Sequence, residues 1–121
     1  MAYIFKNKEF WSKNFLVNRH TLIPRPETEL LSEGVISLFK NKKIFILDIG
    51  TGSGCILLSI LSEMKKSKGV GVDISKKAIE VAKKNSKKFQ LTKRAKFYIK
   101  SIDKICNIKF DLIVSNPPYI K

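Results

Sequence analysis

Residues 43–50 read KIFILDIG, residues 51–66 read TGSGCILLSILSEMKK, and together they decide the fold. The first stretch is a short apolar run with β-branched and aromatic residues that ends at glycines, which is typical of a buried parallel strand. The second stretch predicts a helix with lysines in its last turn. Its apolar residues fall on one helical stripe: Ile56, Leu57, Ile60, Leu61 and Met64.

The same alternation of strand and helix continues to the end of the chain. GVGVDIS (69–75) predicts a second strand, KKAIEVAKKNSKKF (76–89) a second helix, AKFYIKS (95–101) a third strand and KFDLIVS (109–115) a fourth. The second helix would turn Ala78, Ile79 and Ala82 inward. Such alternation implies right-handed crossovers and a parallel sheet covered on both faces, so the predicted class is α/β, doubly wound.

Two further elements are predicted before the first strand of this sheet. ETELLSEGVISLF (27–39) carries Leu31, Val35, Leu38 and Phe39 at helical spacing, and YIFKNKEFWSKNFLVN (3–18) has the short aromatic runs of a small antiparallel hairpin. We therefore divide the chain into a hairpin with a proline-rich loop, residues 1–27, and the cofactor-binding half of a catalytic domain, residues 28–121.

Composition excludes several classes of protein. A length of 121 residues with 44% hydrophobic content suffices for one core and argues against disorder. No apolar stretch approaches the ~20 residues of a membrane span, so a soluble, cytoplasmic protein is expected. Cys55, Cys106 and His20 lack metal-ligand spacing, so no metal site is predicted.

The net charge of +14 raises the question of an anionic partner. Of the 24 basic residues 21 are lysine, and they run from Lys6 to Lys121. Such scatter favours a merely solvated surface, and the alternative is an anionic or RNA-bound partner.

The glycine turn DIGTGSG predicts a ligand site. Its glycines at 50, 52 and 54, separated by Thr51 and Ser53, allow a sharp turn and close approach of a ligand. A dinucleotide-binding G-x-G-x-x-G motif would need glycine at Cys55, which counts against NAD. The N-terminus of the following helix favours an anion, and Asp48 favours a cation. S-adenosylmethionine offers both, as a carboxylate and an ammonium/sulfonium pair. The alternative is a strand-to-helix loop without a ligand.

Asp73 ends the second predicted strand, beside the glycine turn. A carboxylate at this position can accept hydrogen bonds from both hydroxyls of a ribose, as in nucleoside-binding doubly wound folds. The alternative role is that of an N-cap for the next helix, since DIS begins one.

The fourth strand is followed by Asn116, Pro117, Pro118 and Tyr119. In a sheet of order 3-2-1-4 this strand lies beside the first, so Asn116 emerges next to the glycine turn, where ligands bind. The Asn116 side-chain oxygen and the Pro117 carbonyl can each accept a hydrogen bond from a planar NH₂ group, and Tyr119 can pack on that group. An ordinary Asn-Pro turn is the alternative.

These residues resemble the class I S-adenosylmethionine-dependent methyltransferases, which have a Rossmann-like fold. FLVNRHTLIPRPETELL (15–31), together with ILDIGTGSGCILLSI (46–60) and FDLIVSNPPYI (110–120), is similar to the HemK/PrmC family of peptide chain release factor glutamine methyltransferases. The resemblance implies methyl transfer to the glutamine amide of the GGQ motif in release factors. It also implies that Gly50 to Gly54, Asp73 and Asn116 hold the cofactor, with an adenine contact near Ile102, and that the NPPY phrase holds the amide.

The resemblance is incomplete, because the family has a helical N-terminal domain and further strands after NPPY. We therefore expect a fragment or a truncated product whose C-terminal strands are missing. Two alternatives for function stay open at this point. One is a nucleic-acid adenine amino methyltransferase, which shares the NPPY chemistry, and the other is a non-catalytic remnant that binds a cofactor.

Overall fold

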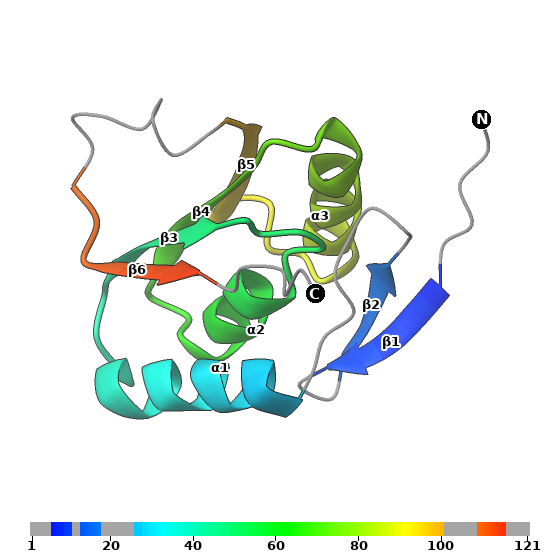
Figure 1. Cartoon of the computed structure of the whole chain (residues 1–121). Helices are drawn as coiled ribbons and strands as arrows, with labels where there is room; N and C mark the ends of the chain where they lie inside the picture. The colour runs from blue at the N-terminus through cyan, green and yellow to red at the C-terminus, as the bar shows by residue number, and fades with distance from the viewer. Residues whose placement is uncertain (1–5, 11–12, 18–25, 101–108, 116–121) are drawn as a thin grey trace.

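The computed structural model describes residues 6–10, 13–17, 26–100 and 109–115 (Figure 1). A small hairpin and a helix precede a parallel sheet whose strands alternate with helices. The elements in chain order are β1 (Lys6–Phe10), β2 (Lys13–Val17), α1 (Pro26–Phe39), β3 (Phe45–Ile49), α2 (Cys55–Glu63), β4 (Lys68–Asp73), α3 (Lys76–Lys88), β5 (Ala95–Ile99) and β6 (Leu112–Ser115).

The main sheet has the predicted order, β5-β4-β3-β6, with every pairing parallel. Ile46 in β3 is the register partner of both Gly69 in β4 and Leu112 in β6. The α/β prediction is therefore confirmed, and so is the antiparallel hairpin, in which Lys6 pairs with Val17 and Phe10 with Lys13.

The hydrophobic core lies between one face of this sheet and all three helices. Its strand residues include Ile46, Ala95, Phe97 and Val114, which point to the same face because they lie in register or two residues apart. Side chains of α1, α2 and α3 join the same cluster. Within the described residues, the helical covering predicted for both faces is thus seen on one face.

The helix α2 departs from the prediction at its C-terminal end. It ends at Glu63, so Lys65 and Lys66 follow the helix instead of occupying its last turn. The positive charge at this end comes from Arg94, whose guanidinium donates to the carbonyl oxygens of Leu61, Met64 and Ser67 at 3.0–3.1 Å. The bond to Leu61 satisfies a last-turn carbonyl that the helix itself leaves without a partner, and the other two hold the loop that follows the helix.

The helix α1 buries a narrower stripe than its spacing predicts. Val35 is buried, whereas Leu38 is 74% exposed. The helix begins at Pro26. Proline suits this position because an N–H in the first turn would have no partner within the helix, and proline has none. The start of the helix lies two residues before the division that we placed at residue 28. Among the described residues no helix is long and apolar enough to cross a membrane.

Candidate functional site

The carboxyl ends of β3, β4 and β6 meet at one edge of the sheet, and the glycine turn lies there. Gly50, Gly52 and Gly54 have φ of 69°, 55° and 81°, values in the left-handed region that favours glycine. The backbone amides of Gly50 and Thr51 both donate to the Val72 carbonyl oxygen, at 2.9 and 3.0 Å. The turn is therefore fixed to the end of β4.

Asp48, near the end of β3, is hydrogen-bonded to the glycine turn. Its side chain is 1% exposed, and its Oδ2 accepts a 2.7 Å hydrogen bond from the Thr51 hydroxyl. Burial raises the pKa of Asp48 to about 7, against the lowering effect of the Thr51 bond, and the charge of Asp73 raises it further. Its Oδ1 has no hydrogen-bond partner among the described atoms. Asp48 is thus a carboxyl that changes charge near neutral pH.

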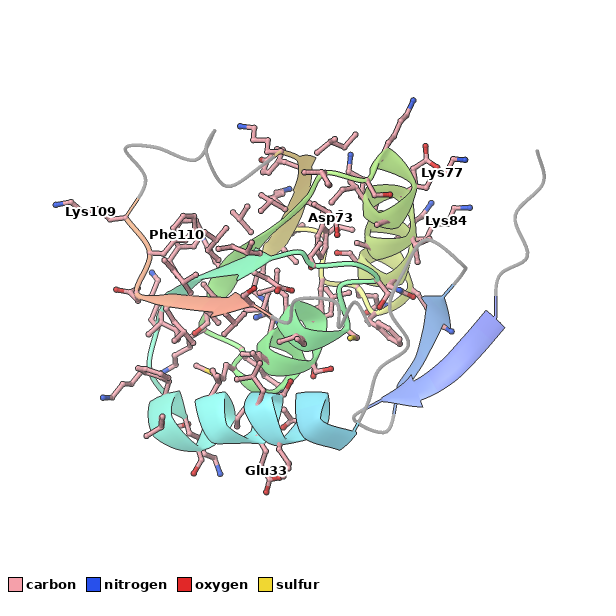
Figure 2. All side chains as sticks on the ribbon, in the orientation of Figure 1. Glu33, Asp73, Lys77, Lys84, Lys109 and Phe110 are labelled. Carbon is pink, nitrogen blue, oxygen red and sulfur yellow. The ribbon has the colours of Figure 1, made fainter. Side chains whose placement is uncertain are left out.

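Asp73 lies at the end of β4, between the glycine turn and the start of α3 (Figure 2). Its Oδ2 accepts from the Gly52 amide at 3.1 Å and its Oδ1 accepts from the Ser75 amide at 2.9 Å. The N-cap of α3 is Ser75, whose hydroxyl accepts from the Ala78 amide, so the alternative N-cap role predicted for Asp73 falls to Ser75. Each Asp73 oxygen keeps a second lone pair, which a ribose hydroxyl can use.

Asn85, in the last part of α3, was not predicted as a site residue. It is fully buried, and its Nδ2 donates a 2.8 Å hydrogen bond to the backbone carbonyl of Ser53 within the glycine turn. The one sequence signal was an amide in the buried stripe of an otherwise lysine-rich helix. The turn is thus tied to β4 through Gly50 and to α3 through Ser53.

The glycine turn is packed against other residues on one side and is open on the other. A Cβ on Gly71 would lie 2.6 Å from the Phe97 ring, and one on Gly54 would lie 3.1 Å from it. A Cβ on Gly50 would meet nothing within 4 Å, so the backbone there faces open space. A ligand can therefore approach the turn at Gly50, while Phe97 packs against its other side.

The N-terminus of α2 presents its first-turn amides without a side-chain cap. Gly54 is the N-cap, and the first turn holds no acidic residue. Backbone amides at such an end favour an anionic group. Cys55, which takes the place of the dinucleotide-motif glycine, is buried, and burial raises the pKa of its thiol to about 12, so it stays neutral.

The remaining predicted site residues, Ile102 and the NPPY phrase at 116–119, lie outside the described residues. Ser115, which ends β6 and precedes that phrase, is the register partner of Ile49, the residue before Gly50. An apolar side chain that was not predicted, Ile74, follows Asp73 and is 79% exposed. It offers an apolar surface beside the Asp73 carboxylate.

The family model described as "Methyltransferase domain" matches residues 40–119, which include the whole glycine turn and every strand of the main sheet. The chain belongs to this methyltransferase family.

Individual proteins that are similar to this chain indicate which methyltransferases it resembles most specifically. The release factor glutamine methyltransferase of Buchnera aphidicola subsp. Schizaphis graminum is 45% identical over 120 residues, and the alignment covers 99% of this chain and 43% of the relative. The bifunctional methyltransferase of Rickettsia prowazekii is 43% identical over 140 residues, and the chain spans 27% of its length. The resemblance to release factor glutamine methyltransferases is confirmed, and the chain spans less than half the length of these relatives.

Solved structures agree on the fold. A putative S-adenosyl-L-methionine-dependent methyltransferase from Methanococcus maripaludis superimposes with a TM-score of 0.63 and 27% identity, covering 71% of this chain and 40% of that protein. The tRNA (uracil-54, C5)-methyltransferase of Pyrococcus abyssi gives a TM-score of 0.73 with 22% identity, over 94% of this chain and 28% of that one. The predicted class I methyltransferase fold is confirmed.

Proposed function

We propose that this methyltransferase domain binds S-adenosylmethionine at the glycine turn and takes part in methylating the side-chain amide of a glutamine. The single observation that carries this proposal is the turn itself, whose backbone is open at Gly50 and joined at Gly52 to the Asp73 carboxylate. The relatives named as release factor glutamine methyltransferases supply the substrate class.

The residues at the turn suit the three parts of this cofactor. Asp73 keeps lone pairs for the ribose hydroxyls, and the exposed Ile74 beside it suits an adenine ring. The uncapped amides at the start of α2 suit a carboxylate. We propose that Asp48 acts mainly through Thr51, because it is buried and bonded to that hydroxyl, and that its charge also favours the cationic part of the cofactor.

The cofactor supplies an activated methyl group, and the chain's own residues must present a weak nucleophile to it. An amide nitrogen attacks poorly because its lone pair is delocalised into the carbonyl. We propose that the Asn116 side-chain oxygen and the Pro117 carbonyl accept hydrogen bonds from the NH₂ group, with Pro118 fixing the backbone and Tyr119 packing on the amide plane. These acceptors orient the nitrogen and stabilise the positive charge that grows on it.

We propose the glutamine of the GGQ loop of a peptide chain release factor as substrate, which places the reaction in the cytoplasm. The net charge of +14 suits a substrate that is bound to an anionic or RNA-containing complex. An adenine amino group would fit the same two acceptors, so a nucleic-acid adenine methyltransferase is the second candidate. A domain that binds the cofactor without turnover is the third.

Transfer of a labelled methyl group to a purified release factor tests this function. Asn116→Ala removes one acceptor and is expected to lower the single-turnover rate by ~10²–10³ with cofactor affinity nearly unchanged. Asn116→Asp retains an acceptor and should be less damaging.

The other outcomes of this experiment would support one of the alternative functions or contradict the role of Asn116. Label transferred to DNA but not to a release factor would show the adenine enzyme. Cofactor binding without transfer to either substrate would show the non-catalytic domain. A rate that barely changes in Asn116→Ala would show that the amide is held elsewhere.

A further inference from the structure

Basic residues concentrate in one part of the fold. The segment from Lys76 to Lys100, which forms α3 and β5, holds ten of the chain's 24 basic residues and one of its ten acidic residues, Glu80. Figure 2 shows Lys77 and Lys84 extending from α3 away from the sheet. Positive charge is therefore concentrated on α3, on β5 and on the residues between them.

A groove of about 360 Å³ runs between α3 and β5. Lys83 and Lys87 of α3 line one side and Lys96 and Tyr98 of β5 line the other. Ser86, which also lines this groove, is 2% exposed, and its hydroxyl has no hydrogen-bond partner among the described atoms. The α3–β5 groove thus combines three cationic side chains with a buried hydroxyl that has no partner among the described atoms.

A second groove, of about 560 Å³, lies on the sheet face opposite the helices. Its lining joins basic side chains to aromatic rings: Lys68, Lys93, Lys96 and Lys100 with Phe45, Tyr98 and Phe110. Phe45 and Phe110 stack with their ring centroids 4.7 Å apart, and Tyr98 is 46% exposed. We call this the sheet-face groove.

The two grooves meet at Lys96 and Tyr98, which line both. Of the described residues that line either groove, none carries a carboxylate. The Lys100 ammonium lies 5.4 Å from the centroid of the Tyr98 ring, so positive charge and an exposed ring occupy the same place. Together they form a continuous cationic surface with aromatic rings set into it.

We propose that these joined grooves bind single-stranded nucleic acid. The lysines suit the repeating charge of a phosphate backbone, and the exposed Tyr98 ring suits the face of an unpaired base. An acidic protein segment would satisfy the lysines but would not need a flat ring between them. The proposed surface is separate from the cofactor site, since none of the lining residues belongs to the glycine turn, although Val72 and Phe97 also contact that turn.

The test measures binding of a labelled oligouridylate of about twelve nucleotides to the whole chain by fluorescence anisotropy, over a series of salt concentrations. The triple variant Lys83→Gln, Lys87→Gln, Lys96→Gln should weaken binding by about tenfold or more and reduce the slope of log K against log salt by about 2. The matched control neutralises three exposed lysines that line neither groove: Lys40→Gln, Lys65→Gln and Lys66→Gln.

Tyr98→Ala separates stacking from charge. It should weaken oligouridylate binding by about fivefold or more while leaving the salt slope unchanged, and it should not affect binding of inorganic polyphosphate. Three results would overturn the proposal: no binding by the wild-type chain, an equal loss in the control triple variant, or tighter binding of poly-glutamate than of oligouridylate.

Discussion

At Asp48, one buried carboxyl is among the groups that hold the glycine turn, through its bond to the Thr51 hydroxyl. The hydrogen bond from Thr51 requires an acceptor oxygen, which both the charged and the neutral carboxyl provide. Burial disfavours the charged form, however, and raises the pKa to about 7. The turn therefore rests on a group that loses its proton near neutral pH at a cost to folding.

The first prediction concerns the pH dependence of stability that follows from Asp48. The pKa is raised in the folded chain, from 3.8 to about 7, so the folded state binds more protons than the unfolded state between these values. The contribution of Asp48 to stability is hence greatest below pH 3.8 and is lost as pH rises towards 7. From pH 6 to pH 8 urea denaturation should show a loss of about 1 kcal/mol in the free energy of unfolding.

Asp48→Asn is the matched variant, because it keeps an acceptor for Thr51 and cannot ionise. The loss of stability between the two pH values should be absent in this variant. An equal loss in the wild type and in Asp48→Asn would assign the pH dependence to other groups.

Asp73 should affect cofactor affinity through its free lone pairs. Asp73→Ala removes a charged acceptor from the ribose hydroxyls and is expected to cost ~1.5–3 kcal/mol of binding free energy for S-adenosylhomocysteine in calorimetry. Glu80→Ala is the control, since it removes one exposed acid of α3 without touching the turn. Unchanged affinity in Asp73→Ala would refute the ribose assignment.

Among the elements, α3 helps to position the glycine turn, although it follows that turn by more than 20 residues in the sequence. Its Asn85 bonds to Ser53, 32 residues away, and Ser75 at its start bonds to Asp73. Both ends of α3 thus contact residues that position the glycine turn.

Asn85→Leu tests this connection between α3 and the turn. The apolar side chain leaves the Ser53 carbonyl without its partner, which should cost ~1–3 kcal/mol of stability and also weaken S-adenosylhomocysteine binding. Ile79→Val trims the buried face of the same helix and should lower stability by ~0.5–1.5 kcal/mol with no change in affinity. If both variants bind the ligand equally at a temperature where both are folded, Asn85 serves stability alone.

Elements with a strong local pattern could be predicted from the sequence, and contacts between distant elements could not. The strand KIFILDIG and its glycine turn have their pattern within a few residues, so both were predicted. Arg94 caps α2 from about 30 residues away, and no local pattern indicates such a partner. The clustering of basic residues was also missed. Ten of the 24 lie between Lys76 and Lys100, but the sequence does not show that α3 and β5, which carry most of them, are neighbours.

For the molecule as a whole, the outer strand β6 is the feature that bears on self-association. Within the described residues β6 pairs on one side, with β3, and its Ile113 is 58% exposed. A strand edge of this kind can pair with another chain. The wild-type chain is therefore expected to self-associate in analytical ultracentrifugation at high concentration.

Ile113→Lys should reduce this self-association, because a charged side chain on an edge strand opposes pairing. Leu38→Lys is the control, since it removes an apolar side chain that is even more exposed than Ile113, from α1 and away from the strand edge. Equal effects of the two variants would show general hydrophobic association, and a monomeric wild-type chain would contradict the expectation.

The most direct test of the whole account is a titration of the ¹⁵N-labelled chain with S-adenosylhomocysteine, followed by amide chemical shifts. We predict saturable shifts at the amides of Gly50, Gly52 and Ile74, with the amides of Lys40 and Lys66 unmoved. A folded chain whose glycine-turn amides do not shift, or whose saturable shifts fall elsewhere, would contradict the claim that this turn holds the cofactor.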